Sequence, residues 1–481
     1  MKKALVLFLT GIIILTLLAC QNSKENSKNT TDSATGEDST SSTEDVTPVI
    51  PDVTYNGADF AILCRGGDWQ KDIFVEGTAE EQSDIVSSAV IERNQRVADK
   101  FDVNFEMVAN LEDPYEIVMA GADEFQIMIP GAQQSFAGVI EGLYVEWGQL
   151  PYVDLSKPWW YQSAVETFTI GGYLYNCLSD YTFNNIQCTA CVYFNRDLLD
   201  TLGVQESIYD LVESGAWTWD KMASIAKLGS ADLDKDNDLH IYFDQYGYVT
   251  QLWGGPMTCL FSQGGSISAK DENDYPYLTV GDEKNEKIMS SFLENIYDQE
   301  WSYVKDGVEV RESFSQGRAI FCEENLGVAT LIFRFSDVDY GIVPPPKYDE
   351  AQANYQTVIN AGTNMTVVPK TNKRLEMTSI LMEYLASDSH ENVLPVYYES
   401  ALKQKGSRDD TAIEMIELIR NCATVDLLAF MGGLNGLDSI GVHMISNNSE
   451  NFYVYYDANI AAANLTIQEY INKYKENAGL Q

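Results

Sequence analysis

Five aspartates stand close together in the stretch "DLDKDNDLHIYFD". Asp232, Asp234, Asp236 and Asp238 alternate with other residues, and Asp244 follows them. Carboxylates at every second position of a loop are how a calcium-binding loop gathers its oxygen ligands. The usual turn glycine is absent and the closing acid is an aspartate, so a solvated acidic turn is the alternative reading. The spacing predicts a structural Ca²⁺ site; the sequence indicates no other cofactor.

Motifs for catalysis are absent from the sequence. The three histidines, His240, His390 and His443, do not form the HExxH pattern of a zinc helix. Neither a GxSxG nucleophile turn nor a GxxxxGK[ST] phosphate loop occurs. A pair of carboxylates for glycoside hydrolysis cannot be recognised from sequence spacing. The sequence therefore favours a protein without catalytic activity, and an exported carbohydrate-active enzyme is the alternative.

Several aromatic residues lie in polar or glycine-rich surroundings. These are Trp69, Trp253, Trp301 and the run Trp159–Trp160–Tyr161. Flat apolar rings beside polar groups suit the faces of sugars. Packing in the core is the alternative for each of them. The aromatic residues therefore indicate a carbohydrate ligand.

The order of expected elements places these residues in an α/β protein. Strands are predicted at 58–67, 101–108 and 125–131, with a helix over 80–100 between the first two. This order is typical of a mainly parallel sheet. Further strands are expected at 173–182, 188–195, 318–322 and 338–347, and a strand and helix over 364–389.

Three later helices have recognisable signals. Over 215–229, Thr218 is the predicted N-cap, Asp220 lies in the first turn and Gly229 ends the helix, with Trp217 and Trp219 packing around its start. Helices are also predicted over 282–297 and 409–422. Another is predicted to begin at Thr466, which forms a capping box with Glu469.

The N-terminus has the features of an export signal. Lys2 and Lys3 precede an apolar run that ends at Cys20. The sequence Leu-Leu-Ala-Cys at 17–20 resembles the lipobox of bacterial lipoproteins, which implies that 1–19 is a cleaved signal peptide and that Cys20 carries lipid. A short anchor helix that stays attached is the alternative. Residues 20–52 are rich in Ser, Thr, Asn and acids, and they predict a disordered tether.

The net charge argues against nucleic acid as a partner, and the cysteine content argues against a complete set of disulfides and a zinc site. The net charge of −41 opposes binding to nucleic acid. Besides Cys20 the chain has seven cysteines, an odd number that cannot all pair within one chain. A lone CxxC at Cys188 and Cys191 is not joined by a second one, as a zinc site would require. Cys191 is expected in the core.

Several phrases together resemble the family 1 extracellular solute-binding proteins of bacterial ABC importers, the group that includes maltose-binding protein. They are "VYFNRDLLDTLGV", "GAWTWDKMASIAK", "YGIVPPPKYDEAQANY" and "ALKQKGSRDDTAIEMIELI". The resemblance implies a two-lobed periplasmic-binding-protein-like (type II) α/β fold with a hinge and a central cleft. Lobe 1 would comprise 53–175 and 341–395, and lobe 2 would comprise 176–340 and 396–481. Crossings are expected near 173–180, 339–347 and 394–403.

The resemblance also points to ligand-binding positions. The polar cluster after the early strand corresponds to Gln133 and Gln134, and the cleft-side strand to Asp180 and Tyr181. The aromatic position before the paired glycines lies near Trp253. The segment after a later strand contributes Glu323. Arg65 and Trp69, which follow the first strand, are further candidates; the tryptophan expected after the later strand is missing, so maltose itself is not the expected ligand.

These observations predict a monomeric lipoprotein that delivers a solute to ABC permease subunits. The expected solute is a mono- or oligosaccharide, with a peptide, polyol or polyamine as alternatives. A surface adhesion lipoprotein is a further alternative. The expected location is the outer face of the cytoplasmic membrane of a Gram-positive bacterium, where contact with the membrane would be through the lipid anchor only.

Overall fold

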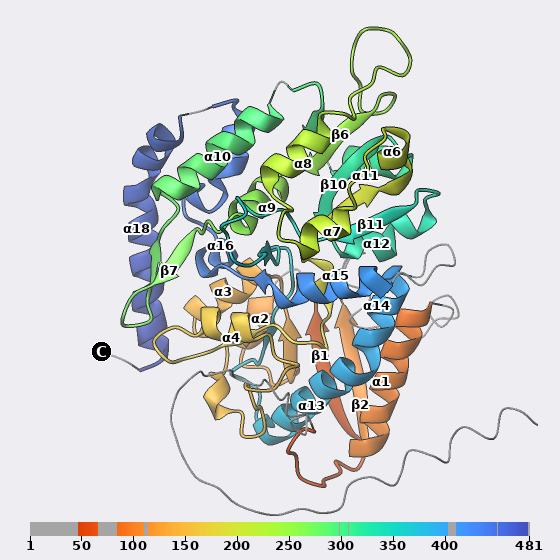
Figure 1. Cartoon of the computed structure of the whole chain (residues 1–481). Coiled ribbons are helices and arrows are strands. Elements are labelled where there is room, and N and C mark those ends of the chain that lie inside the picture. The colour runs from red at the N-terminus through yellow and green to blue at the C-terminus, as the bar shows by residue number, and fades with distance from the viewer. Residues whose placement is uncertain are drawn as a thin grey trace, which may run out of the picture. The chain divides into compact units, whose positions relative to one another are not determined.

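Two five-stranded sheets organise the chain in a computed structural model (Figure 1). The structure describes residues 47–65, 84–109, 114–297, 299–305, 307–402, 410–449 and 451–479. Cys20, the tether as far as residue 46, and Trp69 lie outside the described residues. Among the described helices, none combines the length and apolar character needed to cross a membrane.

The first sheet has the strand order β2-β1-β3-β13-β4. Strands β1, β2 and β3 run parallel, whereas β13 pairs antiparallel with both β3 and β4. The three early strands confirm the sequence prediction, but the strand expected over 173–182 is reduced to β4. The bounds are β1 (Ala58–Cys64), β2 (Val103–Ala109), β3 (Ile127–Ile129), β4 (Asn176–Cys177) and β13 (Thr366–Val367).

The second sheet has the order β11-β5-β10-β6-β9. Strand β11 stops directly before Pro344, because proline has no N–H to donate to a neighbouring strand. The strand predictions over 188–195, 318–322 and 338–347 are confirmed. The bounds are β5 (Ala190–Asn195), β6 (Tyr246–Gln251), β9 (Ser302–Lys305), β10 (Ala319–Asn325) and β11 (Tyr340–Val343).

Three chain segments lie side by side between the sheets. Strand β12 (Thr357–Val358) pairs with β14 (Ala423–Thr424), and Ile359 bridges to Thr189. The chain leaves the first sheet after β4 and the second after β11, close to the first two predicted crossings. A separate hairpin is formed by β7 (Ser268–Lys270) and β8 (Pro276–Leu278).

Helices pack beside both sheets. In Figure 1, α1 and α13 lie beside β1 and β2, and α8 lies beside β6. The helices up to the second sheet are α1 (Ile85–Phe101), α2 (Pro114–Met119), α3 (Ala132–Ile140), α4 (Gln162–Phe168) and α5 (Asn184–Gln187). Those within and after the second sheet are α6 (Arg196–Thr201), α7 (Ile208–Glu213), α8 (Trp219–Ala226), α9 (Gly255–Ser262), α10 (Glu283–Ile296), α11 (Gly307–Ser315) and α12 (Gly327–Leu331). The remaining helices are α13 (Leu375–Asp388), α14 (Leu394–Leu402), α15 (Asp410–Asn421), α16 (Leu427–Met431), α17 (Ile440–Ser446) and α18 (Phe452–Asn477). Short turns are η3 (Trp147–Gln149), η4 (Phe333–Phe335) and η6 (Leu437–Ser439), and η5 (Ser389–Val393) is π-helical.

The start of α8 follows the sequence prediction, but its end does not. Thr218 is the N-cap, and its side chain accepts a hydrogen bond from the Lys221 N–H. Gly229 does not end the helix, which stops at Ala226. A Cβ at Gly229 would lie 2.6 Å from Ile320 Cδ1, so this glycine is required by close packing against β10.

The capping box predicted at Thr466 is wrong. Helix α18 begins at Phe452, so Thr466 lies in its interior and donates its hydroxyl hydrogen to the Ala462 carbonyl. Toward its C-terminus α18 contacts the first-sheet side, where the Tyr474 hydroxyl donates to the Tyr173 carbonyl. Nearer its start it packs on α10 and β8. Because α18 contacts elements beside both sheets, the assignment of 396–481 to lobe 2 stays a prediction.

The Trp159–Trp160–Tyr161 run belongs to the core. Trp159 and Trp160 are fully buried, Tyr161 is nearly so, and Trp301 is also buried. The Trp160 Nε1–H donates to Glu383 Oε2 at 2.9 Å, and the Asp154 N–H donates to the same oxygen. Burial of a large aromatic side chain with its N–H satisfied is the ordinary structural use of tryptophan. The prediction that these residues indicate a carbohydrate site is therefore wrong for this cluster.

Glu383→Gln is expected to flatten part of the pH dependence of stability. Burial raises the pKa of Glu383 to about 7, against the hydrogen bonds from Trp160 and Asp154 that lower it. The folded state therefore holds a proton that the unfolded state has released, and stability falls as pH rises from about 4.5 to about 7. Over this pH range the free energy of unfolding of the wild type should fall by up to about 3 kcal/mol more than that of the variant. Urea unfolding at pH 5 and pH 8 measures this; equal losses would contradict it.

All seven cysteines of the described residues are free thiols. Cys191 is fully buried, as predicted, and Cys188 and Cys422 are partly buried. Burial raises the pKa of Cys64 to about 11 and that of Cys177 to about 12. These thiols are therefore protonated and poorly reactive at neutral pH.

Candidate functional site

A cavity of about 560 Å³ lies between segments that belong to the two sheets. From the first sheet come Arg65, directly after β1, and Gly131 to Gln134 at the start of α3. From the second come Asn325 at the end of β10 and the segment from Trp253 to Phe261 after β6. Ligands of α/β proteins commonly bind at such strand ends. The volume falls within the range of small-molecule sites.

Two helices begin at this cavity without a side-chain cap. The N-cap of α3 is Gly131 and that of α9 is Gly254, and neither helix has a side chain that accepts its first N–H groups. The Ala132 N–H of α3 donates to the Thr363 carbonyl and Pro256 of α9 has no N–H, so it is the positive ends of the two helix dipoles that favour an oxygen atom of a ligand here. A Cβ at Gly131 would lie 2.7 Å from Arg65 Nη1, so the glycine lets the guanidinium approach the start of α3.

The polar side chains of the wall include one positive and one negative charge. Among the described residues that line the cavity, Arg65 is the only cation and Asp438 the only carboxylate. The neutral polar residues are Gln133, Gln134, Thr258, Asn325, Asn360 and Ser439. Amides and hydroxyls can both donate and accept hydrogen bonds. Such a wall suits a neutral molecule with many hydroxyl groups.

The apolar part of the wall is aromatic and partly open to solvent. Trp253 is 69% exposed although it lines the cavity. Phe261 and Phe430 are buried, and Met257 completes the apolar surface. An exposed tryptophan ring beside amides and an arginine can cover one face of a sugar ring. Trp253 is therefore the strongest aromatic candidate for ligand contact.

Four of the predicted ligand-binding residues line this one cavity. They are Arg65, Gln133, Gln134 and Trp253, which come from three separate parts of the fold, since Gln133 and Gln134 are neighbours on α3. Trp69 lies outside the described residues. Arg65 was predicted because it follows the first strand, whereas Gln133, Gln134 and Trp253 were indicated by the family resemblance.

Asp180 and Tyr181 are buried and do not line the cavity. Asp180 Oδ2 lies 2.6 Å from His390 Nδ1 and accepts a hydrogen bond from Arg420 Nη2 at 2.9 Å. The Tyr181 hydroxyl hydrogen-bonds the Thr366 hydroxyl of β13. Each side chain thus has partners within the protein. Both lie where the chain leaves β4, so they stabilise the segment between the sheets.

Glu323 is also buried, behind the wall formed by α9. Its Oε2 accepts a hydrogen bond from the Thr250 hydroxyl at 2.6 Å, and the Tyr248 hydroxyl lies 3.4 Å away. The neighbouring Glu324 accepts from Arg311 Nε at 2.7 Å on the other face of β10. Glu323 does not line the cavity, whereas Thr258 of α9 does.

Sequence reasoning missed the C-terminal part of the cavity wall. Phe430, Asp438 and Ser439 line it, together with Asn360 beside β12. The sequence "GGLNG" lies between Phe430 and Asp438, and its first two glycines and its last have positive φ angles of 66°, 74° and 85°. This glycine pattern indicates a tight turn, but nothing in the sequence places the turn opposite α3.

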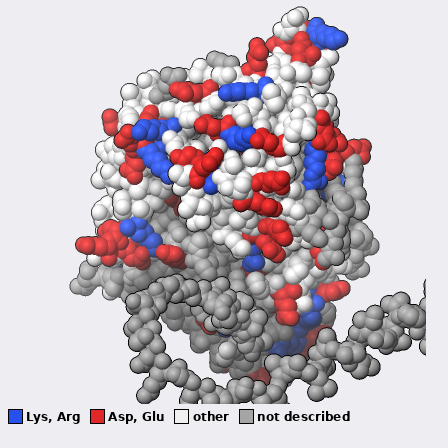
Figure 2. Space-filling model, in the orientation of Figure 1, with Lys and Arg blue, Asp and Glu red and all other residues white. Residues whose placement is uncertain are grey.

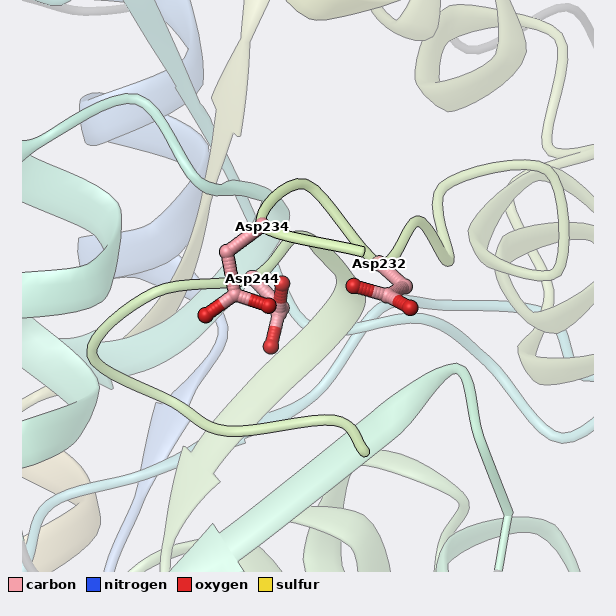
Figure 3. Close-up of side chains that lie close together, drawn as sticks. All are labelled: Asp232, Asp234 and Asp244. Carbon is pink, nitrogen blue, oxygen red and sulfur yellow. The ribbon is translucent and has the colours of Figure 1, made fainter. Parts of the chain in front are cut away.

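Three of the five acidic-loop aspartates come together (Figure 3). Oxygens of Asp232, Asp234 and Asp244 all lie within 4.8 Å of one another. Asp244 is buried, and although burial opposes its ionisation, N–H groups of His240 and Leu233 hold its pKa below the usual range. Asp236 and Asp238 are exposed and do not belong to this group. Three carboxylates suit Ca²⁺, which would take its other ligands from carbonyl groups and water.

Calcium binding at this cluster is retained as a proposal, and it predicts a higher melting temperature with Ca²⁺ than with a chelator. At a concentration about 100 times the dissociation constant, the ion would stabilise the fold by about 2.7 kcal/mol. Asp232→Asn should abolish the shift, whereas Asp236→Asn, a change in the same loop outside the cluster, should keep it. Identical melting curves of the wild type with Ca²⁺ and with chelator would exclude the site.

Comparison with known proteins finds similarity in structure alone. No protein-family model matches the sequence, and no curated protein matches it. A solved ABC substrate-binding protein from Listeria monocytogenes, in complex with cycloalternan, superposes with a TM-score of 0.51 at 12% identity, covering 88% of this chain and 100% of that one. Maltose-bound MalE3 of T. maritima gives 0.52 at 14% identity, covering 87% and 99%. The chain has the two-lobed fold of ABC solute-binding proteins.

A third structure extends the range of solutes bound by this fold. An ABC transporter solute-binding protein from Agrobacterium radiobacter K84, in complex with ribitol, gives a TM-score of 0.52 at 12% identity, covering 86% of this chain and 100% of that one. The expected α/β fold with two lobes is thus confirmed. In the order β2-β1-β3-β13-β4, β13 returns to the first sheet from beyond the second, in agreement with the type II fold that the family resemblance implied.

Proposed function

We propose that this chain is the solute-binding lipoprotein of an ABC importer and that it captures a neutral solute, a mono- or oligosaccharide. The observation that carries the proposal is the cavity between the two sheets. Its described walls combine one arginine, one aspartate, several amides and an exposed tryptophan ring. Hydroxyl groups of a sugar match the amides and charged groups, and the ring matches the apolar face of a sugar.

The charged residues of the cavity wall do not suit a polyamine, which is one of the alternative solutes. A polyamine would require an excess of carboxylates, whereas Asp438 is balanced by Arg65 in the described part of the wall. The solutes named for the three similar structures, cycloalternan, maltose and ribitol, all carry several hydroxyl groups and no charge. A polyol is therefore the nearest alternative to a saccharide, and a peptide is less well matched.

The small number of carboxylates in the cavity wall argues against a carbohydrate-active enzyme. Glycoside hydrolysis commonly needs two carboxyl groups on either side of the scissile bond. Only Asp438 is available among the described residues of the cavity wall, and Glu323 lies behind α9. We therefore propose a receptor that releases its solute unchanged. Closure of the two lobes about Thr189, β12 and β14 would enclose the solute and present a closed form to the permease subunits.

The N-terminal sequence supports a location at the outer face of the membrane. Cleavage before Cys20 and lipidation of this residue would tether a monomeric receptor to the outer face of the membrane. Figure 2 shows acidic and basic side chains interspersed over the described part of one face of the molecule. The net charge of −41 supports the proposal that nucleic acid is not a partner and that contact with an anionic membrane is through the lipid only.

A thermal-shift panel tests the proposal. It would contain glucose, galactose, xylose, maltose, cellobiose, ribitol, spermidine and a dipeptide, each with the protein lacking its signal peptide. A saturable rise in melting temperature with a saccharide, without any product, supports the receptor. A shift with spermidine or the dipeptide alone would contradict the saccharide. No shift with any solute favours an adhesion lipoprotein, and turnover of a glycan favours the enzyme.

A further inference from the structure

One stretch of the cavity wall belongs to neither five-stranded sheet. Residues 359–362 line the cavity and follow β12, in the segment that returns the chain to β13 of the first sheet. We call residues 359–364 the crossing loop. The Asn360 N–H of this loop donates to the Cys188 carbonyl at 2.8 Å, in the segment that precedes β5 of the second sheet. The crossing loop therefore belongs both to the junction between the sheets and to the solute site.

A buried asparagine outside the cavity wall holds the crossing loop. Asn184 is the first residue of α5, is 2% exposed, and is not one of the described residues that line the cavity. Its Oδ1 accepts hydrogen bonds from the Thr363 hydroxyl at 3.1 Å and from the Asn364 N–H at 2.9 Å. Because α5 lies between β4 of the first sheet and β5 of the second, Asn184 joins one connection between the sheets to another.

The crossing loop in turn contacts the start of α3. The Thr363 carbonyl accepts a hydrogen bond from the Ala132 N–H at 3.0 Å, and Asn364 forms a bridge with Gly131. Helix α3 carries Gln133 and Gln134 of the cavity wall. A continuous set of hydrogen bonds thus connects Asn184, through the crossing loop, with two separate parts of the wall.

A loop that is already held in place favours binding. Fixing the backbone of an irregular segment costs conformational entropy at every residue. If the loop became ordered only when the solute arrived, this cost would be subtracted from the free energy of binding. The two hydrogen bonds to Asn184 act on Thr363 and Asn364, directly after the part of the loop that lines the cavity.

We propose that Asn184 is a positioning residue for solute binding, which holds the crossing loop and the start of α3 in the arrangement that forms the cavity before a solute is present. This inference rests on the proposed function of the cavity. Asn184 does not touch the solute. It acts through Asn360 of the crossing loop and through Gln133 of α3, which line the cavity.

The first test compares Asn184→Ala with Asn185→Ala, its matched control. Asn185 lies in the same helix and is fully buried, but its side chain accepts the Ile186 N–H, and none of its hydrogen bonds in the described part of the chain reaches the crossing loop. Calorimetry uses whichever of glucose, galactose, xylose, maltose and cellobiose gives the largest rise in melting temperature. Asn184→Ala should bind about tenfold more weakly and Asn185→Ala should bind like the wild type. Equal affinities of the two variants overturn the proposal.

Substitution of Thr363 isolates one of the hydrogen bonds. Thr363→Val removes the hydroxyl that donates to Asn184 and should weaken binding about fivefold, whereas Thr363→Ser keeps the hydroxyl and should restore wild-type affinity. Adding Thr363→Val to Asn184→Ala should weaken binding no further, because both changes remove the same contact. Additive losses overturn the proposal. If Asn184→Ala does not fold, equal affinities of the valine and serine variants at position 363 overturn it.

Hydrogen exchange without solute distinguishes failure of this inference from failure of the proposed function. The backbone N–H groups of Asn364 and Ala132 should exchange about tenfold faster in Asn184→Ala than in the wild type, since the loop that protects them opens more often. In Asn185→Ala they should exchange as in the wild type. If no saccharide of the panel binds, the proposed function is contradicted, and the exchange rates alone decide whether Asn184 holds the loop. Unchanged exchange in Asn184→Ala overturns that role.

Discussion

Replacing Asp180 with alanine is expected to destabilise the fold by about 3 kcal/mol, since it leaves the partly buried Arg420 guanidinium without its carboxylate. Asp180 is 1% exposed and accepts hydrogen bonds from Arg420 Nη2 at 2.9 and 3.2 Å. His390 Nδ1 lies 2.6 Å from the same carboxylate. These three residues come from the segment after β4, from η5 and from α15. Urea unfolding at pH 7 measures the loss.

Glu283→Ala is the matched control for this prediction. Glu283 forms an ion pair with Lys287 on α10 at 2.5 Å, but both side chains are exposed to solvent. Exposed pairs contribute little, because water solvates each charge when the partner is lost. The unfolding midpoint of Glu283→Ala should therefore match that of the wild type. If Asp180→Ala also matched it, the cluster would not stabilise the segment between the sheets.

Trp253→Ala is expected to weaken binding of the saccharide about 30-fold, the loss typical of an aromatic anchor. The ring is 69% exposed in the structure, so its removal should leave the unfolding free energy unchanged. Calorimetric titration and urea unfolding of the same protein measure the two effects. Wild-type affinity in Trp253→Ala would exclude the ring from the site.

Phe335→Ala is the control for loss of an exposed ring elsewhere. Phe335 is 75% exposed and does not belong to the cavity wall. Its removal should change neither affinity nor stability. A fall in affinity with Phe335→Ala as large as that with Trp253→Ala would show that loss of any surface ring is responsible.

Local signals explain which elements were predictable from the sequence. Strand β1 is a nearly continuous apolar run, and helix α1 has apolar residues at helical spacing. The Thr218 cap of α8 depends only on residues within the same turn. The Thr466 pattern has equally good local chemistry, yet α18 continues through it because packing along the whole helix outweighs one cap. Local chemistry therefore predicts where a helix can begin, whereas tertiary contacts decide where it does.

The site residues that were predicted came from the family resemblance, except Arg65, which was predicted because it follows the first strand. Arg65, Gln133 and Trp253 come shortly after β1, β3 and β6, and strand ends meet at one edge of a sheet. Asp438 follows a glycine-rich turn after α16, and only the return of the chain places it at the cavity. Asp180 was predicted to contact the ligand, but its carboxylate is bound by His390 and Arg420 instead. These partners are more than 200 residues away in sequence, so no local pattern indicates them.

The native thiols are buried or partly buried and protonated at neutral pH. A cysteine introduced on the surface of either lobe can therefore be labelled selectively. Cys188 and Cys422, the least buried of them, have pKa values that burial raises to about 12. A maleimide dye at neutral pH would therefore react first with a cysteine introduced at an exposed position. One such cysteine beside each sheet, in a chain without Cys20, would report the distance between the lobes by energy transfer while every native cysteine stays in place.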